Sequence, residues 1–121
     1  MAEALLCTRL SRYGPVQTLY ASGELDIASG PVLEHAVARA LDGQGGEFHL
    51  DLGGLTFMDS SGAKALLSAH NRVESLGRRL VIVSPSGPVR RVLALMALDQ
   101  VLDVRSPAEP ASDIGGFFAY D

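Results

Sequence analysis

One segment of this chain combines a hydroxyl side chain, a neighbouring carboxylate and a helix start: Leu55-Thr56-Phe57-Met58-Asp59-Ser60-Ser61-Gly62. A strand-like run precedes the segment and an amphipathic helix pattern over 61–76 follows, so Ser60 is expected at or next to the helix N-cap. A phosphate on Ser60 would meet the positive end of the helix dipole and free backbone amides. Asp59 beside it would double the negative charge on a small surface. The pattern therefore predicts a serine whose phosphorylation the fold tolerates and a docked partner does not.

The composition indicates one domain without nucleic-acid chemistry. The chain has 121 residues, 47% of them hydrophobic, and its 10 basic and 14 acidic residues give a net charge of −4. A nucleic-acid surface normally has a clustered basic excess, which this balance argues against. Neither a signal peptide nor a membrane-spanning stretch is visible, so we expect a cytoplasmic protein without membrane insertion. The single cysteine, Cys7, excludes an internal disulfide; we interpret it as a small apolar strand residue, with a reactive thiol as the alternative.

The pattern of elements predicts an α/β fold with the order β-β-α-β-α-β-α-β. Strands that alternate with helices imply parallel crossovers, and a hairpin at Tyr13-Gly14-Pro15 adds an antiparallel N-terminal pair. Gly53-Gly54 is interpreted as a turn between the third strand and the serine segment. The domain is expected to cover 1–105, followed by a loosely ordered tail over 106–121. The expected strands are 4–12, 16–25, 47–52, 80–84 and 101–104, and the expected helices are 31–41, 61–76 and 86–98.

Several side chains receive a structural interpretation. The expected apolar side of the second helix consists of Ala63, Leu66, Leu67, His70, Val73 and Leu76. The three histidines lack metal-ligand spacing and a companion cysteine cluster, so neither a metal nor another cofactor is expected. The pairs Arg78-Arg79 and Arg90-Arg91 are interpreted as solvated helix-end or surface charges.

Three separate blocks resemble single-domain anti-sigma factor antagonists of the STAS family. They are Gly23-Glu24-Leu25-Asp26, the serine segment, and Pro88-Val89-Arg90-Arg91-Val92-Leu93 with the following Leu98-Asp99. The element order matches that family over roughly residues 4–105. The resemblance implies a mixed sheet with helices packed mainly on one face. Two departures stand out: Ala97-Leu98 replaces the common Gly-Leu, and the proline- and glycine-rich tail does not read as the usual last helix.

The resemblance also implies a regulatory role. Ser60 would be phosphorylated by an anti-sigma factor that is itself a serine kinase; the unphosphorylated antagonist binds this kinase and releases a sigma factor. A serine phosphatase would reset the system. The implied partner-binding residues are Asp26, Asp59, Ser60, Ser61 and Gly62. No oligomer is required, so we expect a monomer.

Other interpretations of the same residues stay open. Ser60 could be a plain N-cap residue, and Ser61 could be a minor site of phosphorylation. Gly62 could permit the close approach of a partner's backbone, because it lacks a side chain. Asp26 could have the purely structural role of capping the first helix, and Asp59 could cap the second. The alternative function within this fold is a subunit of a membrane lipid or anion transport complex that docks on an ATPase without a phospho-switch. An enzyme with a serine nucleophile is disfavoured, because neither serine has glycines two residues before and two after it and no histidine is placed as a base.

Overall fold

The computed structural model describes residues 5–12, 16–41 and 46–106 of the chain. In chain order the elements are β1 (Leu6–Ser11), β2 (Gln17–Leu25), α1 (Gly30–Ala40), β3 (Glu47–Met58), α2 (Ser60–Ser75), β4 (Arg79–Val83), α3 (Gly87–Leu95), the 3-10 helix η1 (Leu98–Gln100) and β5 (Asp103–Arg105). The predicted tail lies, apart from Ser106, outside the described residues, as does the Tyr13-Gly14-Pro15 turn.

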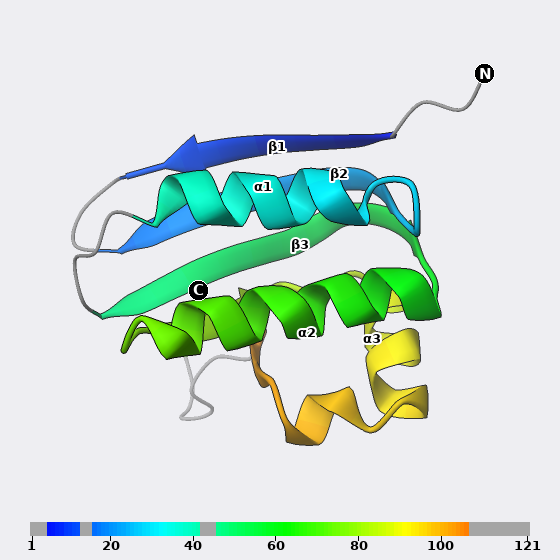
Figure 1. Cartoon of the computed structure of the whole chain (residues 1–121). Helices are drawn as coiled ribbons and strands as arrows, with labels where there is room; N and C mark the ends of the chain where they lie inside the picture. The colour runs from blue at the N-terminus through cyan, green and yellow to red at the C-terminus, as the bar shows by residue number, and fades with distance from the viewer. Residues whose placement is uncertain (1–4, 13–15, 42–45, 107–121) are drawn as a thin grey trace, which may run out of the picture.

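The five strands form one mixed sheet in the order β1-β2-β3-β4-β5. β1 and β2 are antiparallel, whereas all the later neighbours are parallel. Each parallel crossover moves one strand further in the same direction, so right-handed connections place their helices on the same side. Figure 1 shows α1 and α2 lying across one face of the sheet, as the resemblance to the STAS family implies.

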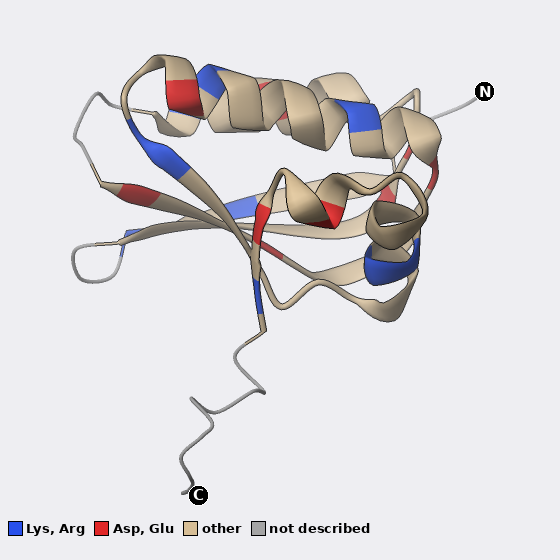
Figure 2. Ribbon diagram, turned by 90° about the horizontal axis from the view of Figure 1, so that it is seen from below, with Lys and Arg blue, Asp and Glu red and all other residues tan. Residues whose placement is uncertain are grey.

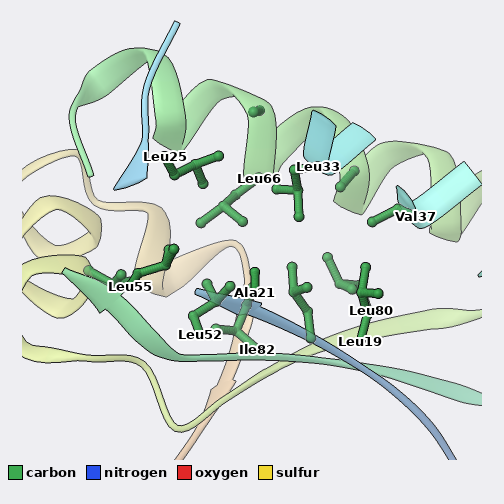
Figure 3. Packing of buried hydrophobic residues seen from close by; sticks show 14 of the residues in the cluster. Leu19, Ala21, Leu25, Leu33, Val37, Leu52, Leu55, Leu66, Leu80 and Ile82 are labelled. Atoms are coloured by element: carbon green, nitrogen blue, oxygen red, sulfur yellow. The ribbon is translucent and has the colours of Figure 1, made fainter. Parts of the chain in front are cut away.

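The core lies between that face and the two long helices. Leu19 of β2, Leu50 of β3 and Ile82 of β4 occupy one continuous register across the sheet. These side chains are almost fully buried, as are Leu33 of α1 and Leu66 of α2, which lie opposite the sheet (Figure 3). Burial of one such leucine or isoleucine contributes roughly 1.5–3 kcal/mol, so this layer positions the starts of both helices firmly.

The predicted turn at Gly53-Gly54 is wrong, because β3 runs without a break from Glu47 to Met58. The register between β2 and β3 shifts next to Ser22, which is opposite Gly54. A Cβ on Gly54 would lie only 2.7 Å from the Cβ of Ser22. The glycine therefore serves close strand packing at a bulge and not a turn.

Three further side chains differ from expectation. Cys7 is exposed, because it is paired opposite Ser22 on the face of the sheet that α1 and α2 do not cover. Leu76 is 55% exposed, because it follows the last residue of α2 and lies outside the buried stripe. Arg78 is buried: its guanidinium donates to the carbonyl oxygens of Gly46 and Glu47, each at 3.4 Å, and lies 5.6 Å from the centre of the Phe48 ring.

A cluster of ion pairs joins β3, β4 and β5. Arg105 donates to both carboxylate oxygens of Glu47, at 3.2 and 2.9 Å, and His49 lies 2.9 Å from the same carboxylate. The hydrogen bonds from Arg105 and then from His49 lower the pKa of Glu47 to about 2. Burial raises the pKa of Asp103, but hydrogen bonds from Arg79 and Arg105 outweigh it and leave this pKa below its ordinary value.

Candidate functional site

The serine segment lies where two neighbouring parallel strands end. Leu25, the last residue of β2, is paired with Met58, the last residue of β3. The next residue on each strand is an aspartate, Asp26 and Asp59 respectively, and the Asp59 N–H donates to the Leu25 carbonyl oxygen at 3.4 Å. The strand register therefore brings both predicted acidic residues to one end of the sheet. Figure 1 shows α1 and α2 beginning at that end, and Figure 2 shows acidic segments there.

Asp59 is the N-cap of α2. Its backbone is extended, its Oδ1 accepts a hydrogen bond from the Gly62 N–H at 2.9 Å, and its carbonyl oxygen accepts from the Ala63 N–H at 2.9 Å. The carboxylate also lies at the positive end of the helix dipole, which is favourable. Ser60 was expected either at the N-cap or next to it; the structure places it next to the N-cap, which is Asp59.

Ser60 is the first residue of α2 and is exposed. Its hydroxyl makes no hydrogen bond with any other described residue, and the same holds for Ser61, which is half-buried. The Gly62 N–H is taken by the Asp59 carboxylate, whereas the N–H groups of Ser60 and Ser61 make no hydrogen bond with a described residue, so these two remain open to an anion at Ser60. A serine nucleophile requires a base within hydrogen-bond reach; neither hydroxyl bonds to a described histidine.

Gly62 is buried inside the protein. A Cβ at this position would collide with the carbonyl oxygen of Leu25 and would lie 2.9 Å from Cγ of Met58. The absence of a side chain therefore lets the first turn of α2 approach the end of β2. This internal contact explains the glycine without any partner.

Asp26 organises the loop before α1. Its Oδ1 accepts hydrogen bonds from the N–H groups of Ala28 and Ser29, at 3.0 and 3.1 Å. The Asp26 N–H in turn donates to the Ser29 hydroxyl at 2.9 Å, and that hydroxyl donates to the Glu24 carbonyl oxygen at 2.7 Å. Ser29, not Asp26, is the N-cap of α1. Asp26 therefore holds the loop that contains the exposed Ile27.

Two exposed apolar side chains lie at the same end of the sheet as the serine. Ile27, in the loop after β2, is 79% exposed, and Phe57, near the end of β3, is 44% exposed. Ile27 also borders a shallow hollow of about 440 Å³ between α1 and α2, which Ser61 lines on the other side. Exposed apolar anchors surrounded by polar groups are typical of protein interfaces. Sequence reasoning missed both residues, because an isolated isoleucine or phenylalanine looks like a core residue.

The charges around the hollow are mostly negative. Asp26 and Glu34 line it together with Lys64, which is one turn along α2 from Ser60. Two carboxylates and one ammonium group therefore line the hollow. Among the described residues no three His, Cys, Asp or Glu side chains gather as metal ligands. Nor, within the same residues, is any helix both long and apolar enough to span a membrane.

Fold and site together define a small α/β domain with an exposed serine at a helix start. The chain belongs to the STAS domain family: the family model described as "Mlab, STAS domain" matches residues 8–103.

Solved structures show the same fold at low identity. An anti-sigma factor antagonist from Mycobacterium paratuberculosis matches with a TM-score of 0.71 and 24% identity over 86% of this chain and 88% of its own. The anti-sigma factor antagonist SpoIIAA in its unphosphorylated form matches with a TM-score of 0.64 and 21% identity, covering 85% and 91% of the two chains. The murine anion transporter Slc26a9 matches with a TM-score of 0.65 and 20% identity over 74% of this chain, but over only 15% of the transporter.

Proposed function

We propose that this protein is an anti-sigma factor antagonist whose binding is switched by phosphorylation of Ser60. Unphosphorylated, it binds an anti-sigma factor serine kinase and thereby releases a sigma factor; phosphorylation ends the complex and a serine phosphatase restores it. One observation carries this proposal: Ser60 is exposed, makes no hydrogen bond to a described residue and is the first residue of α2, at the end of the sheet where the exposed Ile27 and Phe57 also lie. The likeness to anti-sigma factor antagonists supports it.

The switch follows from charge and space. Phosphorylation of Ser60 adds about −1.5 to −2 charges at neutral pH, next to the Asp59 carboxylate. The free protein accommodates the phosphate, because water, the helix dipole and open N–H groups stabilise it. A partner seated on Ile27 and Phe57 would exclude that water and leave the added charge without a counter-ion. A difference of roughly 3 kcal/mol would weaken binding more than a hundredfold.

In this mechanism the protein supplies no catalytic group. Asp59 fixes the start of α2 and Asp26 fixes the neighbouring loop, so both position the surface that the kinase recognises. Ser61 borders the hollow beside that surface and Gly62 allows the close packing beneath it. Ser60 is the group that the partner modifies.

The first test is mass spectrometry of the protein isolated from its own cells. A phosphate-sized mass increase on Ser60 is expected in part of the population. The protein with Ser60→Ala should then co-purify with its partner under all conditions, and the identified partner should phosphorylate wild type but not this variant. Ser60→Asp is expected to weaken the measured affinity at least tenfold.

A matched control distinguishes the effect of a negative charge at position 60 from the effect of added negative charge elsewhere on the protein. Ser75→Asp makes the same chemical change at the last residue of α2, about 22 Å away along the helix axis, and should bind like wild type. Equal affinities for wild type, Ser60→Ala and Ser60→Asp would exclude a phospho-switch.

That last result would favour a second function, supported by the likeness to an anion transporter. In it the protein is a STAS subunit of a membrane lipid or anion transport complex that docks on an ATPase constitutively. Co-purification with an ATPase, together with unmodified Ser60 under all growth conditions, would support this function over the first.

A further inference from the structure

One cation lies beside the proposed phosphorylation site. Lys64 is the only lysine of the chain, and it is exposed on α2, four residues after Ser60. It lines the hollow between α1 and α2 together with the carboxylates of Asp26 and Glu34. Lys64 nevertheless makes no ion pair or hydrogen bond with any residue that the structure describes. Its ammonium group is therefore available to another anion.

The helix places Lys64 over the turn that begins with Ser60. Residues four apart on a helix share a face; they lie about 6 Å apart along the axis, with Cβ atoms roughly 5–6 Å apart. Helical side chains lean towards the N-terminus of their helix, so Lys64 projects back over Ser60. An acidic group four residues before a basic group is also the more favourable of the two orders. An anion attached to Ser60 is therefore within reach of the Lys64 ammonium group.

A phosphate on Ser60 needs such a cation. Asp59, the preceding residue, carries a negative charge and repels the phosphate. The N–H groups of Ser60 and Ser61 make no hydrogen bond with a described residue and can bind phosphate oxygens, but amides carry no net charge. The other cationic residue of α2, Arg72, lies in its last turn. Lys64 therefore supplies the positive charge that the start of this helix otherwise lacks.

We propose that Lys64 is the counter-ion of phosphorylated Ser60 in the free protein. This inference rests on the proposed function, because it concerns the modified form of the same serine. A phosphoserine carries about −1.5 to −2 charges and three strong acceptor oxygens, whereas each carboxylate of the hollow carries a single charge. The ammonium group therefore pairs with the phosphate in preference to Asp26 or Glu34, and it holds the modified side chain along α2.

This pair favours the released state of the protein. In the free protein the pair stays at the surface, where water solvates both groups and pairing costs little. A partner that covers Ser60 has to separate the ammonium group from the phosphate or bury both groups, and either change opposes binding. Lys64 is thus a positioning residue: it acts on the phosphate that is already attached and increases the difference in affinity between the two forms of the protein.

The test uses the full-length protein with phosphoserine placed at position 60 by genetic encoding, so it requires no kinase. Because Lys64 is the only lysine, isotope-labelled lysine gives one side-chain ammonium signal in NMR, and we expect this signal to move on phosphorylation. A phosphorus NMR titration should show that Lys64→Gln raises the second pKa of the phosphoserine, with the acid dissociation constant falling about twofold. The direction follows because loss of a nearby positive charge disfavours the dianion. Lys64→Arg keeps the charge and should restore the wild-type constant.

Arg72→Gln is the matched control, because it removes the same charge from an exposed position of the same helix, about 18 Å from Ser60 along the axis. That distance exceeds the Debye length of about 10 Å at 0.1 M salt, so the titration should equal that of wild type. A Lys64→Gln titration equal to wild type, an equal effect of both variants, or a lysine signal indifferent to phosphorylation would overturn the inference. The two proposals fail separately: unmodified Ser60 in cells overturns the switch, whereas a phosphoserine that ignores Lys64 overturns only the pairing.

Discussion

The cap of α2 permits a test of what holds the start of this helix. Asp59 holds the start of this helix through one hydrogen bond, from the Gly62 N–H to Oδ1 at 2.9 Å, and through its charge at the helix dipole. Asp59→Ala removes both contributions. Loss of an N-cap costs about 1 kcal/mol, and loss of the charge costs a further 0.3–1 kcal/mol or so. We therefore expect a destabilisation of about 1.5 kcal/mol.

Asp59→Asn separates the two contributions, because asparagine caps a helix about as well as aspartate but carries no charge. It should lose only the dipole part, less than about 1 kcal/mol. Urea unfolding followed by far-UV circular dichroism measures both variants, with the slope unchanged and only the midpoint moved. For a chain of this size 1 kcal/mol corresponds to roughly 3–6 °C in Tm.

Glu34→Ala is the matched control, because it removes an exposed carboxylate that makes no hydrogen bond to a described residue. It should change stability by less than about 0.5 kcal/mol. If Asp59→Ala were no more destabilised than this control, or if Asp59→Asn were as unstable as Asp59→Ala, the capping argument would be refuted.

Three other changes test separate features of the fold. Gly62→Ala should destabilise the protein by at least about 1–3 kcal/mol in urea unfolding, because its Cβ would overlap the Leu25 carbonyl oxygen. Ala97→Gly should stabilise it by about 0.5–1 kcal/mol, because Ala97 has a left-handed backbone with φ of 56°. Arg105→Gln should raise the pKa of Glu47 from about 2 towards 4.5 in a carboxyl NMR titration. Since that pKa is lowered in the folded state, its stabilisation is present above about pH 4.5 and is lost towards pH 2; the variant should lose less stability over this range.

Each of these has a contrary outcome. A Gly62→Ala protein as stable as wild type would mean that α2 moves away from β2 at little cost. An Ala97→Gly protein that is less stable would show that the left-handed position is not strained. An unchanged Glu47 titration in Arg105→Gln would place the origin of the pKa shift outside the pair.

The sequence by itself determined the order of elements and the start of α2. These depend on local signals: the 3.6-residue spacing of Leu66 and Val73, the alternation along the strands, and an Asp-Ser-Ser-Gly segment between a strand and a helix. The strand expected over 80–84 is likewise present as β4, and its Val81 and Ile82 are fully buried. Such signals act within a few residues, so they are readable without the fold.

Predictions from local sequence were wrong where contacts with a distant segment determine the backbone conformation or the burial of a side chain. Gly53-Gly54 resembles a turn, yet β2 pairs alongside and keeps the strand extended through both glycines. Arg78 resembles a solvated charge, yet its guanidinium lies inside the protein and donates to the carbonyl oxygens of Gly46 and Glu47.

The candidate site likewise contains residues that local sequence predicted and residues that only the tertiary structure revealed. Ser60 and its neighbouring carboxylate were visible in the sequence, because a helix cap is a local motif. Only the pairing of Leu25 with Met58 brings Asp26 and Ile27 beside them, and only the tertiary structure leaves Ile27 and Phe57 in water. Exposure depends on what the rest of the chain covers, and spacing along the sequence does not contain that information.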